Sequence, residues 1–348
     1  MEGEIKNLFQ VWILAITCLT YCYHISARIS AGIPRLLSFL PIIYLFIILP
    51  LKLTTIHLCG FTAFLLVWLA NFKLILFAFD HGPLFPPPSK LSHFISISSL
   101  PINIKPSSNP SHRNPKSSSG SILLAIKVFS LALLLHVYNY RQYLHQNVIL
   151  LINCLHIYLF LEIGLATCAA PVRAIFGFEL ELQFNEPYLA TSLQDFWGRR
   201  WNLMVTGILR SIVYNPIRRI STRAIGYKWA PLPAVFAAFV VSGLMHEIVY
   251  YYLTRAPPTW EMTSFFILHG VCLIVEVAAK KLLSDRWRLH RAISSILLLG
   301  FMIMTSVWLF CPLLLKNGVS ERMITELYSF SNLIKNKGLL YYWFWHEK

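Results

Sequence analysis

Long apolar stretches alternate with shorter polar ones along almost the whole chain. Most of the apolar stretches approach or exceed the roughly 17–25 residues that an α-helix needs to cross about 30 Å of hydrocarbon. They lie at residues 8–23, 36–53, 56–79, 122–138, 148–170, 230–254, 262–279 and 293–312. Because a backbone that crosses lipid must satisfy its own hydrogen bonds, this pattern predicts an all-α polytopic membrane protein. We expect about eight transmembrane helices in a single membrane-embedded domain, 1–348.

Two segments break the pattern. Leu203–Val213 is apolar but too short to span a membrane, and basic clusters flank it. We expect a re-entrant or interfacial helix there, with its backbone buried against protein. Residues 86–121 are rich in proline and serine and lack helical periodicity. This composition predicts a surface loop that is partly disordered.

Composition adds a strong positive charge to this picture. The 348 residues are 56% hydrophobic and only 13% charged, which agrees with a membrane protein, yet the net charge is +15 with histidine neutral. The excess of cations must face anionic lipid headgroups, a phosphate-bearing substrate or nucleic acid. The high apolar content argues against nucleic acid and leaves lipid and phosphate as candidates.

The seven cysteines show no CxxC pair and no zinc-ligand spacing, and most lie inside apolar runs. We therefore expect them to act as small core hydrophobes. The run Leu8–Tyr23 is similar to the core of a signal peptide, but Glu2 and Glu4 precede it and no small-residue cleavage pattern follows. A retained first span is expected instead.

Lysine and arginine collect in alternate loops, which sets the expected orientation. Cytoplasmic loops of membrane proteins carry an excess of these residues, so we expect the basic loops to be cytosolic and both termini to be luminal. The basic loops hold Arg28 and Arg35; Lys90, Lys105, Arg113 and Lys116; Arg199 to Lys228; and Lys280, Lys281, Arg286, Arg288 and Arg291. The turns around Thr54–Thr55 and Pro257–Pro258 are poor in charge.

Ionisable residues inside membrane spans are costly, so each is a candidate functional group. The candidates are His136, His156, Glu162, His246, Glu247, His269 and Glu276. An intramembrane histidine most often hydrogen-bonds a neighbouring helix, and that structural role is the first expectation for His136, His156 and His269.

His246 differs from the other histidines in its neighbours. On a helix, Ser242, His246 and Tyr250 share one face at four-residue spacing. Glu247 projects about 100° away, so it can orient His246 only indirectly. Gly243 leaves room for another helix or a ligand to approach closely.

The chemistry expected of His246 is proton transfer. The run "HEIVY" (246–250) is similar to the start of a zinc-protease helix, but Tyr250 stands where the second histidine is required, so no metal site is predicted. Burial in an apolar site disfavours the charged imidazolium and keeps the imidazole free as a general base.

A second polar patch, "SLQDFWGRRWNLMVTGILR" (192–210), interleaves arginines with aromatic residues. From 195 to 228, Asp195 is the sole acidic residue among these basic ones: Arg199, Arg200, Arg210, Arg218, Arg219, Arg223 and Lys228. Such a belt can hold anionic headgroups, or it can grip a phosphorylated cosubstrate through bidentate arginine contacts. The two patches together suggest a phosphate-bearing donor on the cytosolic side whose reactive end reaches a buried histidine. Acyl transfer from a thioester would need such a water-excluding site.

Several segments of the chain resemble a known family. "DFWGRRWN" (195–202) and, further along the chain, "SGLMHE" (242–247) resemble the plant wax synthases. These are long-chain-alcohol O-fatty-acyltransferases of the membrane-bound O-acyltransferase superfamily. "WLANFKLILFAFDHGPL" (68–84), "SLPINIK" (99–105) and "FNEPYLATSLQDFWGRRWN" (184–202) are also similar to segments of that family, so the resemblance covers nearly the whole chain.

The resemblance implies a bundle of membrane helices around a tunnel, with 184–254 as the catalytic core segment. It implies Asn202 and His246 as the catalytic pair, acyl-CoA as cosubstrate without a further cofactor, and residence in the endoplasmic reticulum. His246 would take the proton from the acceptor hydroxyl as its oxygen attacks the thioester carbonyl. The residues assigned to the CoA end are Trp197, Arg199, Arg200 and Trp201.

The acceptor is less narrowly defined, since proteins of this resemblance use fatty alcohols, sterols or diacylglycerol. We rank fatty alcohols first, sterols or triterpenoids second and diacylglycerol third. Related sterol and diacylglycerol enzymes carry Val-His after their Trp-Asn, where this chain has Val205-Thr206, so their own sites are not carried over. A lipid or proton-coupled transporter, the alternative from a different class, would more often show two related halves, and this chain shows no internal symmetry.

Overall fold

Helices dominate the computed structural model, which describes residues 2–102, 118–177, 180–282, 290–330 and 332. Within these residues, seven helical stretches are long and apolar enough to cross a membrane. They are Glu2–Ser26, Ile33–Lys52, Ile56–Ala78, Gln146–Phe176, Pro231–Thr254, Glu261–Leu282 and Arg291–Lys316. The eighth predicted span forms α6 (Ser118–Tyr138), whose apolar part, Ile122–Tyr138, is shorter than the others. The all-α polytopic architecture is therefore confirmed.

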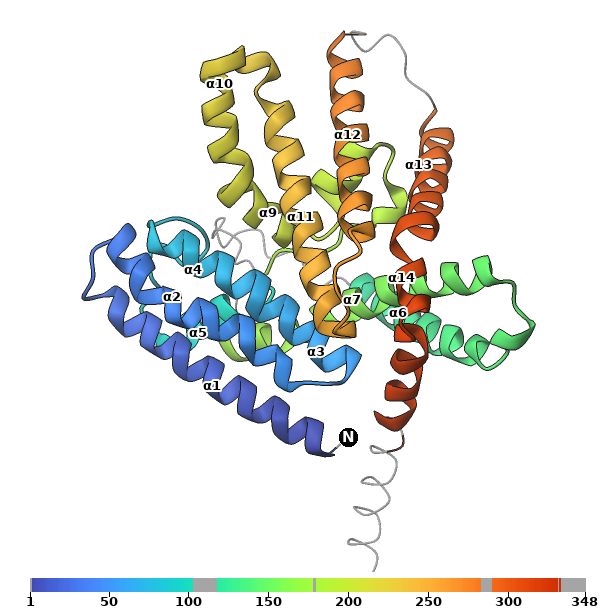
Figure 1. The fold of residues 1–348 in the computed structure, drawn as a ribbon, viewed down its shortest axis with the longest axis horizontal. Helices are drawn as coiled ribbons and strands as arrows, with labels where there is room; N and C mark the ends of the chain where they lie inside the picture. Colours follow the sequence, from blue (N-terminus) through green and yellow to red (C-terminus); the bar gives the residue numbers. More distant parts are fainter. Residues whose placement is uncertain (1, 103–117, 178–179, 283–289, 331, 333–348) are drawn as a thin grey trace, which may run out of the picture.

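The helices gather into groups that Figure 1 separates clearly. On one side lie α1 (Glu2–Ser26), α2 (Ile33–Ile48), α4 (Asn71–Ala78) and α5 (Leu91–Ser99). Opposite them α10 (Asn215–Trp229), α11 (Pro231–Thr254), α12 (Glu261–Leu282) and α13 (Arg291–Thr305) stand roughly side by side. The remaining long pair, α6 and α7 (Gln146–Phe176), packs together and extends to the right in that view.

One span is the central helix of the bundle. The helix α3 (Ile56–Ala63) continues through a π-helical segment, Phe64–Ala70, into α4. In its most apolar window 83% of the residues are buried against protein, compared with 28% for α1 and 22% for α11. The other spans therefore leave apolar side chains such as Ile13 and Ile296 exposed on the surface, where lipid would cover them.

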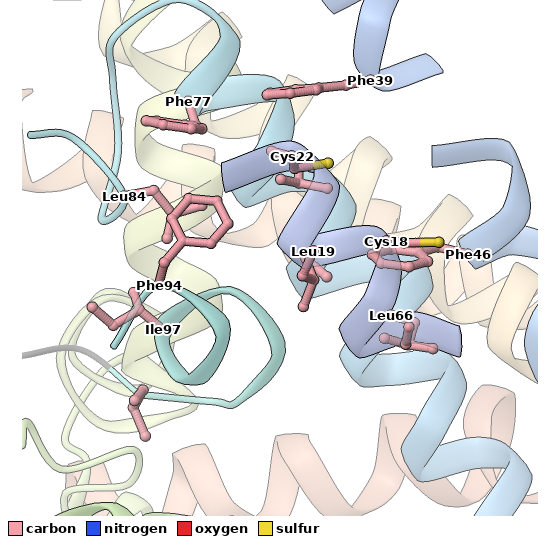
Figure 2. Packing of buried hydrophobic residues seen from close by; sticks show 14 of the residues in the cluster. Cys18, Leu19, Cys22, Phe39, Phe46, Leu66, Phe77, Leu84, Phe94 and Ile97 are labelled. Atoms are coloured by element: carbon pink, nitrogen blue, oxygen red, sulfur yellow. The ribbon is translucent and has the colours of Figure 1, made fainter. Parts of the chain in front are cut away.

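The prediction of a surface loop over residues 86–121 is wrong for residues 91–99, which form the helix α5. Phe94 and Ile97 lie three residues apart on one helix face and are buried against Leu19 and Cys22 of α1 (Figure 2). The intervening serines hide the apolar periodicity, yet Ser98 and Ser99 are buried too, because their hydroxyls donate to backbone carbonyls one turn earlier. Residues 103–117 lie outside the described residues.

The short apolar segment 203–213 is a helix, as expected. α9 (Leu203–Leu209) runs through the π-helical residues Arg210–Tyr214 into the basic helix α10. Its buried face holds Met204, Val205, Ile208 and Leu209. The start of α9 is therefore held inside the protein, while α10 carries its arginines outward.

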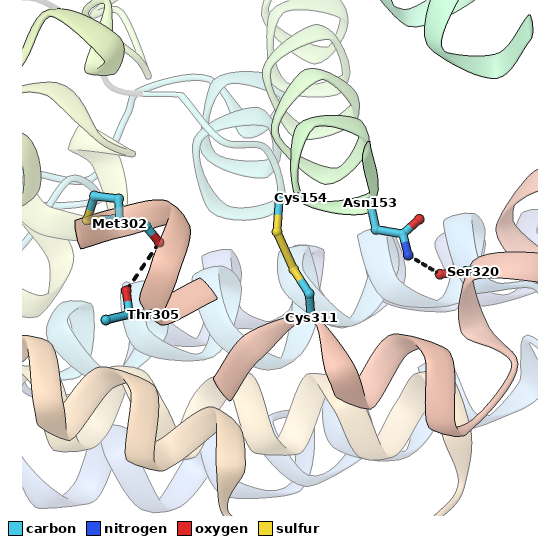
Figure 3. The surroundings of a disulfide bond; sticks show 6 residues. All are labelled: Asn153, Cys154, Met302, Thr305, Cys311 and Ser320. Carbon is cyan, nitrogen blue, oxygen red and sulfur yellow. Dashed lines mark hydrogen bonds between the residues drawn. A yellow bond between two sulfur atoms is a disulfide. The ribbon is translucent and has the colours of Figure 1, made fainter. Parts of the chain in front are cut away.

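The expectation that all the cysteines are isolated core hydrophobes is wrong for two of them. Cys154 of α7 and Cys311, which precedes α14 (Pro312–Lys316), form a disulfide, with their Cα atoms 6.6 Å apart (Figure 3). A separation of 157 residues hid the pair from spacing rules. The other five cysteines are free, and Cys18, Cys22 and Cys59 are buried as expected.

Alkylation of the unfolded protein should distinguish the two cysteine classes. Without reductant, five cysteines should take up the alkylating agent, and Cys154 and Cys311 should react only after reduction. Peptide mass spectrometry with and without reductant measures both sets. Alkylation of Cys154 without reductant would contradict the pairing.

Candidate active site

A cavity of about 460 Å³ lies among α3, α7, α9, α11 and α12. Its wall is mostly aromatic and aliphatic. Four of the six predicted site residues line it: Trp197, Trp201, Asn202 and His246. The fold therefore brings the two conspicuous sequence patches, 195–202 and 242–247, to one cavity.

The hydrogen bond made by His246 sets which of its ring nitrogens carries the proton. Nδ1 lies 2.8 Å from the backbone carbonyl oxygen of Ser242. A carbonyl only accepts, so Nδ1 carries the hydrogen, and in the neutral ring Nε2 keeps its lone pair. No described residue hydrogen-bonds Nε2, so the cavity holds a histidine whose proton-accepting atom is free.

Aromatic rings hold this imidazole in place. The ring of Phe266 lies 4.2 Å away, and the ring of Trp68 meets it edge-on at 5.2 Å. Phe310 is the third aromatic neighbour, at 6.2 Å. Trp68 and Phe310 both sit in π-helical segments, which locally change the direction of side chains and are frequent at functional sites.

The helical-face prediction for α11 is confirmed. Ser242, His246 and Tyr250 all line the cavity. Gly243 packs against the next helix so closely that a Cβ there would lie 3.0 Å from the Cα of Thr263. The room left by this glycine is occupied by α12.

Glu247 has a structural role that the sequence did not reveal. It is 4% exposed and accepts hydrogen bonds from the backbone N–H of Trp260 (2.8 Å) and of Thr263 (3.2 Å). The Thr263 hydroxyl donates to the same carboxylate at 3.3 Å. The Trp260 N–H lies just before α12 and the Thr263 N–H lies in its first turn, where the helix dipole favours a negative charge.

Changing Glu247 to alanine should destabilise the fold more than it impairs chemistry. Buried N–H groups at the start of α12 would lose their acceptor, which costs about 1–3 kcal/mol. We expect a lower melting temperature in detergent, and activity per folded molecule within a few-fold of the parent. Glu247→Gln keeps one acceptor oxygen, so its melting temperature should lie between those of the parent and of Glu247→Ala. An unchanged melting temperature with lost activity would assign the carboxylate to catalysis instead.

Asn202 begins α9 in a strained backbone conformation, with φ 37° and ψ 66°. Asparagine tolerates this left-handed region better than most residues. Its Oδ1 accepts the backbone N–H of Val205 at 3.4 Å, so it also caps the helix. Its Nδ2 donors have no acceptor among the described residues and remain for a ligand in the cavity that Asn202 lines.

A chain of hydrogen bonds holds Trp197 in place and gives His269 a structural role. The indole Nε1 donates to His269 Nδ1 at 3.3 Å, so the other ring nitrogen, Nε2, carries the hydrogen and donates to the Thr305 hydroxyl at 2.9 Å. Thr305 donates in turn to the Phe301 carbonyl at 2.8 Å. Both nitrogens of His269 are used, so the predicted structural role is confirmed for this histidine.

The other ionisable candidates lie away from His246. Glu276 accepts the backbone N–H of Leu193 at 2.8 Å, and Glu162 pairs with Lys127. His136 is exposed on α6. His156 is fully buried, with neither ring nitrogen bonded among the described residues. His246 is thus the candidate of this set that lines the cavity.

The two arginines assigned to the CoA end do not line the cavity and differ from each other. Arg200 donates to Asp195 at 2.8 Å and to the carbonyls of Asn185 and Glu186, both at 3.2 Å. Its guanidinium is therefore engaged in holding the turn before Asn202. Arg199 is exposed and has no acidic partner among the residues described, which leaves it free for an external anion.

His57 and Glu326 form a polar pair that was not predicted from the sequence. His57 lines the cavity, and its Nδ1 lies 2.9 Å from Glu326 Oε2. Glu326 also accepts the backbone N–H groups of Ile56 (2.6 Å) and His57 (3.1 Å). Burial acts to raise the pKa of Glu326, but the hydrogen bonds from His57 and Ile56 outweigh it and hold that pKa below its ordinary value. A signal was present: His57 stands at the very start of the predicted span 56–79.

Comparison with known proteins identifies the family of the chain that carries this site. A family model described as "Membrane bound O-acyl transferase family" matches residues 180–268, which contain Trp197, Asn202 and His246. The long-chain-alcohol O-fatty-acyltransferase of Simmondsia chinensis is 47% identical, over 98% of this chain and 99% of that protein. The chain belongs to the membrane-bound O-acyltransferase family.

Its membership can be stated more narrowly. A protein of Arabidopsis thaliana named "Probable long-chain-alcohol O-fatty-acyltransferase 3" is 50% identical over 98% of each chain. The chain therefore groups with the plant wax synthases, which confirms the predicted resemblance. Acyl-CoA–sterol O-acyltransferase 1 of the same plant is 44% identical over 92% of this chain, so similarity alone does not choose the acceptor.

Proposed function

We propose that this protein transfers an acyl group from acyl-CoA to a lipid hydroxyl, with a long-chain fatty alcohol as acceptor and a wax ester as product. The observation that carries the proposal is the state of His246. Its Nδ1 is committed to the Ser242 carbonyl, which leaves Nε2 as the free nitrogen in an apolar cavity that Asn202 also lines. The proposal includes residence in the endoplasmic reticulum, which co-localisation with a resident marker tests.

The proposed chemistry needs one base and no acyl-enzyme. The acceptor O–H gives its proton to Nε2 of His246 while its oxygen attacks the thioester carbonyl carbon. When the tetrahedral intermediate collapses, the C–S bond breaks and the same proton passes to the CoA sulfur. His246 therefore returns to its starting neutral form after each turnover. The aromatic wall keeps water from competing with the alcohol.

Asn202 is proposed to stabilise the charge that develops on the carbonyl oxygen. Its Nδ2 has two N–H donors, and no described residue takes them up. Donors already in place in a dry cavity stabilise an oxyanion more strongly than water does, because they need no reorganisation. The strained backbone and the cap to Val205 would hold this amide in one position.

Arg199 is proposed to contact the phosphates of CoA at the membrane face. Arg199→Gln should raise the Michaelis constant for acyl-CoA by roughly threefold to fivefold, the effect of losing one exposed charge pair, with little change in melting temperature. Arg200→Gln is the matched variant and should lower the melting temperature, because it breaks the contacts to Asp195 and two carbonyls. Steady-state kinetics with acyl-CoA varied measures both. An unchanged Michaelis constant for Arg199→Gln would mean that Arg199 contacts lipid headgroups and not CoA.

The acceptor is tested directly with membranes that contain the full chain. Labelled acyl-CoA is supplied with a long-chain alcohol, a sterol or diacylglycerol, and the labelled ester is measured. We expect the alcohol to be the best acceptor. If a sterol is the better acceptor, the proposed acceptor is wrong but the proposed acyl transfer stands. That outcome would agree with the 44% identity to a sterol enzyme. Absence of any ester above the level of membranes lacking the protein would refute the proposal.

A further inference from the structure

A second polar cluster lies away from His246, between α3, α6, α7 and the helical residues 319–330. Its members are His57, Tyr138, Asn153 and His156, here called the distal cluster. Asn153 and His156 are completely buried, and Tyr138 is 1% exposed. None of the four belongs to the proposed acyl-transfer chemistry.

The distal cluster holds an unusual number of unpaired polar atoms. His57 Nε2, both ring nitrogens of His156, the Tyr138 hydroxyl and Asn153 Oδ1 are buried with no hydrogen-bond partner among the described residues. Buried polar atoms are costly when unpaired, and folded proteins nearly always pair them. Five such atoms in one place indicate a site built for a hydrogen-bonding guest, either ligand or water.

Contacts within the cluster bring these atoms together. The rings of His57 and His156 lie 6.0 Å apart, and those of Tyr138 and His156 lie 6.3 Å apart. Asn153 precedes His156 by three residues and so shares its helix face. Its Nδ2 donates to the Ser320 hydroxyl at 2.6 Å, which leaves Oδ1 unbonded (Figure 3).

The distal cluster meets the cavity of His246 through His57, and the other three members lie behind His57. His57 lines that cavity, together with Ile157 of α7 and Val319. Trp68 packs on His246, whereas Gly60 is next to Leu253, so α3 and α11 run antiparallel. Along α3 and the π-helical segment that follows it, the distance from His57 to Trp68 is about 16 Å at roughly 1.5 Å per residue. The cavity thus has a reactive end at His246 and a polar end at His57.

The chemistry of the distal cluster selects its guest. A neutral imidazole has one donor and one acceptor, and a phenol has both, so the guest must both donate and accept. The ionised Glu326 beside His57 would repel a carboxylate, and complete burial would disfavour any ion. The wall between the two ends carries Phe61, Phe64 and Phe160, which suit an alkyl chain. A hydroxyl at the far end of an alkyl chain meets all three conditions.

We infer that the distal cluster binds the terminal hydroxyl of an ω-hydroxylated alkyl chain whose reacting end lies at His246. This inference rests on the proposed acyl transfer and adds a preference to it. The chain can come from either substrate. It can be an α,ω-diol that serves as acceptor, or the acyl chain of an ω-hydroxyacyl-CoA that serves as donor.

Two competition arms separate these sources in the purified full-length protein. In the first, palmitoyl-CoA is offered with cetyl alcohol or with its α,ω-diol. In the second, cetyl alcohol is offered with palmitoyl-CoA or ω-hydroxypalmitoyl-CoA. The readout is the ratio of kcat/KM for the ω-hydroxylated and plain substrates, with the diol rate divided by two for its two reactive ends. We expect a ratio of about ten in one arm, which corresponds to 1.4 kcal/mol, the size of one buried hydrogen bond.

Variants at His57 test whether the distal cluster causes the preference. His57→Phe keeps an aromatic ring but removes Nε2, so the ratio should fall to about one. His57→Gln places an amide near the lost nitrogen and should retain part of the preference. His136→Phe, at an exposed histidine of α6 outside the cavity, is the control and should keep the full ratio. Because each value is a ratio within one variant, partial unfolding does not imitate the effect.

Two outcomes would overturn the inference while the proposed function stands. One is a ratio near one in both arms, which would mean that ordered water alone fills the distal cluster. The other is a preference that survives His57→Phe. Failure to esterify even cetyl alcohol with palmitoyl-CoA would instead overturn the proposed function, and the inference with it.

Discussion

Replacing His246 with alanine should lower kcat for ester formation by about 10²–10⁴-fold, the usual contribution of a general base. Its ring contacts Phe266 and Trp68 but donates a single hydrogen bond, to the carbonyl of Ser242 within its own helix. The loss of fold stability should therefore be small beside the loss of rate. Labelled ester production at saturating acyl-CoA and alcohol measures the effect, and a melting curve of the same preparation checks the fold.

Two further variants make this test specific to the free nitrogen. His136→Ala removes an exposed histidine on α6 and should leave the rate unchanged. His269→Gln disturbs the chain that holds Trp197, so we expect a reduction smaller than that of His246→Ala. A His246→Ala variant that keeps more than about a tenth of the parent rate would show that the proton goes elsewhere.

Replacing Asn202 with glycine should lower kcat by about 10²–10³-fold, as the loss of one oxyanion donor does in other acyl-transfer enzymes. Glycine is the informative substitution because the backbone at this position has φ 37°, which glycine adopts without strain. It also costs only a few tenths of a kcal/mol as a helix N-cap. The variant therefore removes the amide while keeping the backbone and most of the stability.

Asparagine-to-aspartate replacement separates the donor role of Asn202 from its capping role. Asn202→Asp keeps an acceptor for the Val205 N–H but removes both Nδ2 donors and adds a negative charge beside the developing oxyanion. We expect its kcat to be at least as low as that of Asn202→Gly, with an unchanged or higher melting temperature. Normal turnover by either variant would confine Asn202 to capping α9.

The positions of the long apolar helices were predictable because hydrocarbon imposes a strict local rule. An apolar segment of about 20 residues can cross only as a helix that bonds its own backbone, so each predicted crossing is found as a helix. The helical face shared by Ser242, His246 and Tyr250 follows from residue spacing in the same local way. The short helix α5 was not predicted because its serines made the segment look polar. In the structure their hydroxyls donate to backbone carbonyls of the same helix, so the serines can be buried.

The pair Asn202 and His246 was named through resemblance to a family, not through spacing. The polar neighbours of His246 on its helix face favoured it, but spacing alone did not exclude His156 and His269, because all three are histidines in apolar runs. The tertiary structure separates them: Trp197 and Thr305 use both nitrogens of His269, and His156 does not line the cavity, whereas His246 lines it and keeps Nε2 free. The sequence carries no trace of which nitrogen is occupied.

The sequence by itself determined the membrane architecture, the basic surface and the family, since these depend on local composition and on motifs read in order. The tertiary structure alone decided that Glu247 caps α12, that Cys154 pairs with Cys311, and that His57 meets Glu326 at the far end of the cavity. Each of these is a contact between elements distant in the chain. A hydrogen bond or a disulfide depends on distances of a few ångströms, and only packing of the whole bundle sets those distances.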